Sequence, residues 1–177
     1  MIFHIMIPGV EIITPIRDLK LSREEEISYL KAKGVDMNFA KAVYSINKGL
    51  WGTSVGGKET LSSKGMLPEE AWPTQVTKTG TEEVKLGFVK GELTTVNDQS
   101  FGHPTEAIQY LQTIAGPYGI GRDIHVGDTI IGIKGRVGFE AAAPMLILKG
   151  HHALEKHVLS KWQLQWKDQL AAFYGNW

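Results

Sequence analysis

Hydroxyl and amide side chains are concentrated in residues 44–54, where the sequence reads YSINKGLWGTS. Ser45 and Ser54 bracket this segment, and Asn47 lies between them. A hydroxyl can both donate and accept a hydrogen bond, so a pair of hydroxyls can bind a ligand carboxylate or ammonium group. Because loops on a rigid scaffold often carry binding groups, this spacing favours a site for a small polar ligand.

The same segment contains an apolar pair, Leu50 and Trp51, between its two glycines. We expect this pair to anchor the loop in a hydrophobic core, which turns the hydroxyls and the freed backbone N–H groups toward the ligand. A purely structural loop has a similar composition. The residues alone therefore leave ligand binding and a structural role as alternatives.

Two glycine-rich stretches match phosphate-binding loops only in part. Residues 52–59 read GTSVGGKE, where Glu59 replaces the hydroxyl that holds magnesium in a P-loop. Residues 119–124 read GIGRDI and lack the third glycine of a dinucleotide fingerprint. A glycine-rich bend and the entry to a strand are the better interpretations, so we expect no cofactor site in this chain.

Histidines and tryptophans in the C-terminal part also bear on chemistry. His151, His152 and His157 lack the i, i+4 spacing of a zinc-binding pair on a helix, so we predict no metal site. Trp162 and Trp166 are four residues apart and share a helical face, which favours a core or a subunit interface over a ligand stack. A Ser-His-Asp triad can be drawn in almost any chain with six histidines, so the histidines of this chain do not favour a hydrolase.

Composition excludes several classes of function. The 177 residues include 19 basic and 19 acidic side chains, so the formal net charge is zero and the electrostatic signature of a nucleic-acid binder is missing. There is no cysteine, which excludes disulfides, thiolate metal sites and a cysteine nucleophile. No apolar run reaches the length of a membrane span.

The N-terminal part should contain strands and one helix. Residues 1–7 and 10–14 are rich in β-branched side chains and are expected to be short strands. Ser22 is a good helix N-cap, and Glu25 occupies the capping-box position three residues later. Gly34 is expected to end this helix.

The remaining pattern predicts an α+β fold, a mostly antiparallel sheet with packed helices and a long C-terminal helix. The expected elements are a surface excursion at 55–80, a hairpin at 83–97 turning at Lys90–Gly91, a helix from Pro104 to Gly116, strands within 122–134 turning at Gly127–Asp128, and one helix from Pro144 nearly to the end.

Several motifs together resemble the argininosuccinate synthase family. Residues 44–54 are similar to the pattern [WY]-S-x-D-E-N-L-[WM]-x-x-S that opens the family's synthetase domain. Residues 115–136, AGPYGIGRDIHVGDTIIGIKGR, are similar to its AGKHGVGRxDxVENRxxGxKSR. Shorter matches at 22–27, 86–91 and 149–155 keep the family's order, so the resemblance covers nearly the whole chain.

The resemblance implies a division near residues 36–43. Residues 1–40 would be the C-terminal remnant of an α/β nucleotide-binding domain, contributing a strand and a helix. Residues 44–177 would be the synthetase and multimerisation domain, truncated at its C-terminus. The family's S-G-G-x-D-[ST]-S loop for ATP is absent, so the chain is expected to be a fragment that is inactive alone.

The family's full-length enzyme joins L-citrulline to L-aspartate for arginine biosynthesis, consuming Mg-ATP as a substrate and releasing AMP and pyrophosphate. The resemblance implies a cytoplasmic homotetramer whose partners are citrulline, aspartate and ATP, with no nucleic acid and no membrane. A non-catalytic ligand-binding or assembly module derived from the same fold is the alternative.

The resemblance also implies residue roles, although it assigns no catalytic residue to this chain. Ser45 and Ser54 fall on the two serines that bind citrulline in the family. Gly127 and Phe139 stand where the family has a Glu and a Tyr that also contact citrulline. Asp128, one residue after Gly127, could replace the lost carboxylate.

Overall fold

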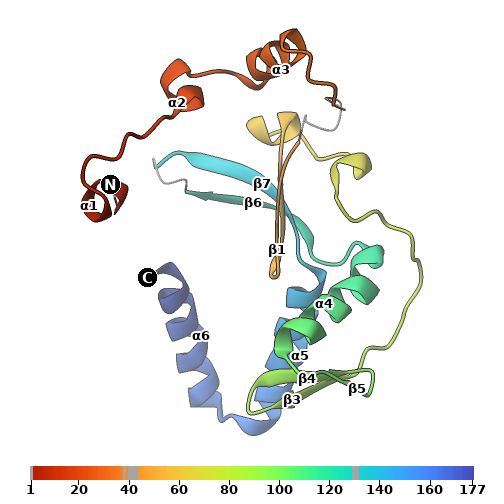
Figure 1. The fold of residues 1–177 in the computed structure, drawn as a ribbon. Coiled ribbons are helices and arrows are strands. Elements are labelled where there is room, and N and C mark those ends of the chain that lie inside the picture. The colour runs from red at the N-terminus through yellow and green to blue at the C-terminus, as the bar shows by residue number, and fades with distance from the viewer. Residues whose placement is uncertain (1, 38, 40–43, 129–131) are drawn as a thin grey trace. The chain divides into compact units, whose positions relative to one another are not determined.

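The computed structural model describes residues 2–37, 39, 44–128 and 132–177 (Figure 1). The chain divides into two compact units, residues 1–42 and 43–177. The predicted boundary lies partly outside the described residues, and the identities predicted for the two domains remain predictions.

The first unit contains the helices α1 (Ile2–Met6), α2 (Pro15–Leu19) and α3 (Arg23–Ala32). The predicted capping box of α3 is confirmed. The Ser22 N–H donates to Glu25 Oε2 at 2.7 Å, and the Glu25 N–H donates to Ser22 Oγ at 3.3 Å. The bond from the Ser22 N–H also lowers the pKa of Glu25, because it stabilises the ionised carboxylate.

The strands expected at 1–7 and 10–14 are a wrong prediction. Residues 2–6 form α1, and residues 10–14 have no regular structure. Ile2 and Phe3 are 72% and 64% exposed. A strand needs a neighbour for its backbone hydrogen bonds, whereas a helical turn forms them internally, as the bond from the Ile7 N–H to the Phe3 carbonyl shows.

The second unit is built on a four-stranded antiparallel sheet in the order β1-β2-β7-β6. Figure 1 labels β1, β6 and β7 of this sheet. Its strands are β1 (Ser45–Gly49), β2 (Gly52–Gly56), β6 (Arg122–Asp128) and β7 (Lys134–Glu140). The YSINKGLWGTS segment is therefore mostly a hairpin and not a loop. Leu50 and Trp51 lie at its tip, 42% and 57% exposed, so the predicted anchoring in a core is wrong.

One face of this sheet is covered by residues 57–76, which include the 3₁₀ turns η2 (Lys58–Leu61) and η3 (Glu69–Ala71). Leu67 and Trp72 pack there with the fully buried Val55. Gly138 allows the close approach, because an added Cβ would lie 2.1 Å from Leu67 Cδ1 and 3.3 Å from the Trp72 ring. The excursion predicted at 55–80 is therefore in part a core layer, which corrects the expectation of a surface segment.

Polar contacts also fix this covering segment. Arg122 pairs with Glu69 at 2.6 Å and stacks on Trp72, with its guanidinium 5.1 Å from the ring centroid. The hydrogen bond from Arg122 lowers the pKa of Glu69. Glu140, 5% exposed, accepts from the Thr74 hydroxyl at 2.7 Å.

A second core lies between helices and a smaller antiparallel sheet, β3-β4-β5. The strands are β3 (Leu86–Val89), β4 (Glu92–Val96) and β5 (Gln99–Ser100), and the helices are α4 (Pro104–Ala115), followed by η4 (Gly116–Tyr118), and α5 (Ala142–Val158). Val96 and Leu111 are fully buried in this core. The hairpin and α4 confirm the prediction, and Lys90 and Gly91 turn with φ of 52° and 87°.

The single C-terminal helix expected from Pro144 is in fact two helices, α5 and α6 (Lys161–Asn176). The chain breaks at Ser160, whose hydroxyl accepts from the Gln163 N–H while the Gln163 side chain accepts from the Ser160 N–H at 2.8 Å. This capping box starts a new helix inside a continuous apolar pattern. Trp162 and Trp166 of α6 are 65% and 62% exposed.

The α+β class with antiparallel sheets and long C-terminal helices is confirmed. Within the described part of the chain, every helix is too short or too polar to cross a membrane.

Candidate functional site

The sheet face opposite the covering segment carries most of the predicted binding residues. Side chains alternate between faces along a strand, and directly paired residues on neighbouring strands share a face. Asn47 pairs with Ser54, Ser54 with Phe139, and Phe139 with Asp123. These side chains form one row that crosses all four strands. We call this side of the sheet the open face.

A second row follows two residues along each strand. Ser45 pairs with Gly56 on β2, and His125 pairs with Val137 on β7. An added Cβ at Gly56 would meet nothing within 4 Å, so the space beside the Ser45 hydroxyl is open. The structure thus brings Ser45, Ser54 and Phe139 onto one face, although they come from different strands.

Contacts within the open face orient its polar groups. The Asn47 Nδ2 group donates to Ser54 Oγ at 3.5 Å. The His125 and Phe139 rings meet edge to face, with centroids 5.7 Å apart. Gly52 lies against the same phenyl ring, since a Cβ there would come within 2.6 Å of Phe139 Cε1, and its φ of +140° suits only glycine.

Gly127 lies at the bottom of a hollow next to His125. It pairs with Gly135 across β6 and β7, and an added Cβ at Gly127 would meet nothing within 4 Å. A cavity of about 300 Å³ here is lined by His125, Val137 and the two glycines, and also by Val126, Asp128 and Arg136. The tight turn predicted at Gly127–Asp128 is wrong, because both residues lie within β6, where strand pairing continues to Lys134.

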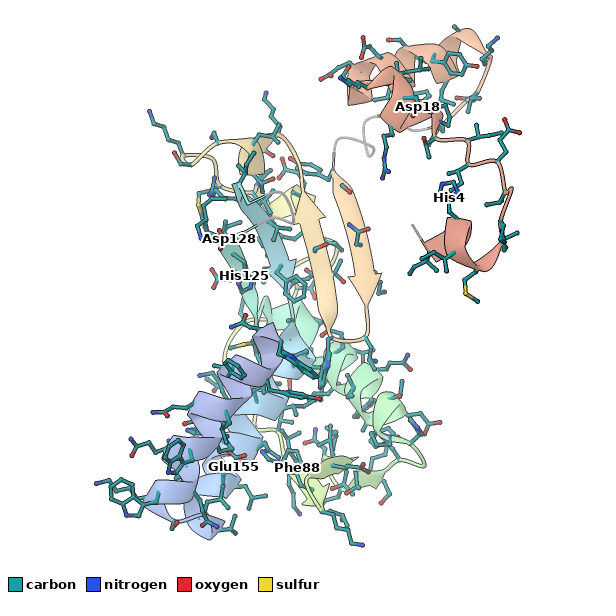
Figure 2. The ribbon with its side chains drawn as sticks, turned by 90° about the vertical axis from the view of Figure 1, so that its left-hand side faces the viewer. His4, Asp18, Phe88, His125, Asp128 and Glu155 are labelled. Carbon is teal, nitrogen blue, oxygen red and sulfur yellow. The ribbon has the colours of Figure 1, made fainter. Side chains whose placement is uncertain are left out.

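Asp128 is separated from the serines. It belongs to the same strand as His125 (Figure 2), but alternation places the two side chains on opposite faces. Its carboxylate pairs with Lys134 Nζ at 2.6 Å. Of the residues predicted for the site, Asp128 is therefore the one that the fold does not bring to the open face.

The family model described as the arginosuccinate synthase C-terminal domain matches residues 44–177. The chain belongs to the argininosuccinate synthase family.

Argininosuccinate synthase of Methanocaldococcus jannaschii is 38% identical over 176 residues, which are 98% of this chain and 44% of the relative. The Pyrococcus furiosus argininosuccinate synthase is 33% identical over 167 residues, 92% of this chain and 40% of the relative. That of Xanthomonas campestris is 32% identical over 173 residues, 91% and 42% respectively. The chain thus spans less than half the length of these argininosuccinate synthases.

A separate titratable cluster joins α5 to α6. Glu155, 9% exposed, faces His151 Nδ1 at 3.1 Å and His152 Nδ1 at 3.3 Å, and it accepts a hydrogen bond from Lys167. That bond lowers the pKa of Glu155, and the same contact raises the pKa of Lys167. Glu155 is labelled in Figure 2.

His151 and His152 therefore belong to a polar contact between α5 and α6. Among the described residues, no group of three or more His, Cys, Asp or Glu side chains is arranged to hold a metal ion.

Sequence reasoning missed two side chains of the open face, Asp123 and His125. A period-two reading of residues 122–128 would have placed both on the face of Gly127. Both were missed because a turn was predicted at Gly127–Asp128, which ended the expected strand too early.

Proposed function

We propose that this chain supplies part of the citrulline-binding surface of an argininosuccinate synthase, a cytoplasmic ligase that joins L-citrulline and L-aspartate at the expense of ATP. Ser45 and Ser54 bind citrulline through their hydroxyls. The groups that bind ATP and aspartate belong to the remainder of the complete protein, which acts as a homotetramer.

One observation carries this proposal. Ser45 and Ser54 are nine positions apart in the sequence, yet the pairing of β1 with β2 puts both side chains on the open face. Asn47 lies between them on the same face and contacts Ser54 Oγ. Three short polar side chains can thus converge on one ligand, while the covered face is occupied by packing.

The chemistry required of such a surface is positioning. The ureido oxygen of citrulline attacks the α-phosphorus of ATP and pyrophosphate leaves. The amine of aspartate then attacks the ureido carbon and AMP leaves. Holding the amino-acid end of citrulline fixes the ureido group for attack and lowers the entropic cost of bringing the reactants together. Serine hydroxyls suit this task because their hydrogens rotate to match the ligand.

The test is citrulline binding by the complete protein, measured by calorimetry, for the wild type and the Ser45→Ala/Ser54→Ala variant. Loss of two ligand hydrogen bonds should weaken citrulline affinity by about tenfold or more. Ser63→Ala is the matched control, because Ser63 is an exposed serine of the covering segment. An affinity of the double variant within about twofold of the wild type would contradict the proposal.

A second candidate is a non-catalytic binding or assembly module. Gly127 and Phe139 favour it, because they lack the carboxylate and the hydroxyl that the resemblance implies at these places on the open face. The exposed Trp162 and Trp166 of α6 also suit an assembly surface. Turnover of citrulline, aspartate and ATP by the complete protein supports the ligase, whereas self-assembly without turnover supports the module.

A further inference from the structure

We propose that Asp123 supplies the carboxylate that pairs with the ammonium group of the amino-acid ligand on the open face. This inference rests on the proposed function and names a residue of the same site. It replaces the role suggested for Asp128 by the sequence.

The position of Asp123 in the sheet supports this role. It lies in the row Asn47–Ser54–Phe139–Asp123, two strands away from Ser54. Two strand spacings amount to about 10 Å, which leaves room for the polar head of an amino acid between the two side chains. The ligand would lie over Phe139, the residue between them.

The Phe139 ring is suited to an ammonium group in that place. The face of an aromatic ring attracts a cation through its quadrupole, and this attraction does not need the tyrosine hydroxyl. A neighbouring carboxylate adds a charged hydrogen bond, which is stronger than a neutral one. Phe139 and Asp123 together offer what an ammonium group requires.

Asp123 and Asp128 differ in whether a cation already pairs with the carboxylate. Asp123 Oδ1 accepts from the Ile124 N–H at 2.7 Å, and no cation pairs with Asp123 among the contacts of the described residues. Its charge is therefore available to a ligand. Asp128 is already paired with Lys134 at 2.6 Å and belongs to the opposite face.

The neighbour of Asp123 in β6 supports the same placement. Ile124 packs on the core of the covered face. A shift by one residue exchanges faces in a strand, so Asp123, which pairs with Phe139, belongs to the open face.

The experiment compares two ligands and two variants of the complete protein by calorimetry. The ligands are L-citrulline and 5-ureidopentanoate, which is citrulline without its α-amino group. The variants are Asp123→Asn and the matched control Asp128→Asn, each of which removes one negative charge from β6 without a change in side-chain size. Circular dichroism checks that both variants fold.

The wild type and Asp128→Asn should prefer citrulline over 5-ureidopentanoate by about tenfold or more, as expected for a charged hydrogen bond. Asp123→Asn should lower this preference to about threefold or less. A full preference in Asp123→Asn, or a loss of preference in Asp128→Asn, would overturn the assignment. A wild type that binds neither compound overturns the proposed function itself, which is a different outcome from a misplaced carboxylate.

Discussion

The two faces of the β1-β2-β7-β6 sheet differ in what they contact. The covered face holds buried apolar side chains and two polar side chains, the buried Glu140 and the half-buried Arg122, which bond to the covering segment. The open face of the same strands holds serines, an asparagine, an aspartate and a histidine that are half-buried or exposed. Neighbouring residues of a strand point to opposite sides, so one short sequence can supply both the packed face and the polar face.

Because of this difference, we expect the residues that stabilise the fold and the residues that bind the ligand to lie on opposite faces. Substitutions on the covered face should unfold the second unit before they affect binding. Substitutions on the open face should change ligand affinity and leave the fold intact, because their side chains have few neighbours to lose.

We expect the largest difference in the free energy of unfolding between the alanine variants of two tryptophans, one in the covering segment and one at the hairpin tip. Trp72→Ala should lower the free energy of unfolding by about 3–5 kcal/mol, because Trp72 is 8% exposed and packs beneath the sheet. Trp51→Ala should cost less than about 1 kcal/mol, since this ring is 57% exposed at the hairpin tip. Urea denaturation followed by fluorescence measures both free energies, and equal losses would mean that the hairpin tip is as well packed as the covered face.

Two glycines of the same sheet give a smaller contrast. Gly138→Ala puts a Cβ 2.1 Å from Leu67 Cδ1 and should destabilise by about 1–3 kcal/mol. Gly127→Ala meets nothing within 4 Å and should be neutral or stabilise by up to about 1 kcal/mol. Thermal unfolding monitored by circular dichroism separates the two outcomes. A stable Gly138→Ala protein would mean that the covering segment packs loosely.

The smallest effect should come from the ion pair between Glu69 and Arg122. Since the folded-state pKa of Glu69 is lowered by Arg122, its stabilisation is complete above the unfolded pKa and disappears as the pH falls through the folded value. The wild type should therefore be more stable than Glu69→Gln at roughly pH 7, and the difference should vanish at roughly pH 2. Glu70→Gln, a change of the same charge on an exposed neighbour, should show no such dependence.

Local signals predicted part of the fold correctly. Ser22 and Glu25 identified the start of α3, and the Lys90–Gly91 turn identified the β3–β4 hairpin, because capping and turn chemistry depend on a few adjacent residues. The same local rule was present at Ser160 and Gln163, but the apolar pattern around it masked the break between α5 and α6.

Features that depend on distant partners could not be predicted in this way. Leu50 and Trp51 looked like core residues, yet their burial depends on what lies against the hairpin tip. Residues 1–7 looked like a strand, yet a strand needs a neighbour to pair with. The serines were found through the family resemblance, whereas Asp123 was missed because the predicted turn at Gly127–Asp128 hid the strand that the pairing of β6 with β7 shows.

We propose that the open face binds the amino-acid substrate. A crystal structure of the complete protein with L-citrulline tests it most directly. We expect ligand density within hydrogen-bonding distance of the Ser45 and Ser54 hydroxyls, on the side of the sheet away from Trp72. Citrulline bound elsewhere, with both hydroxyls facing only solvent, would contradict it.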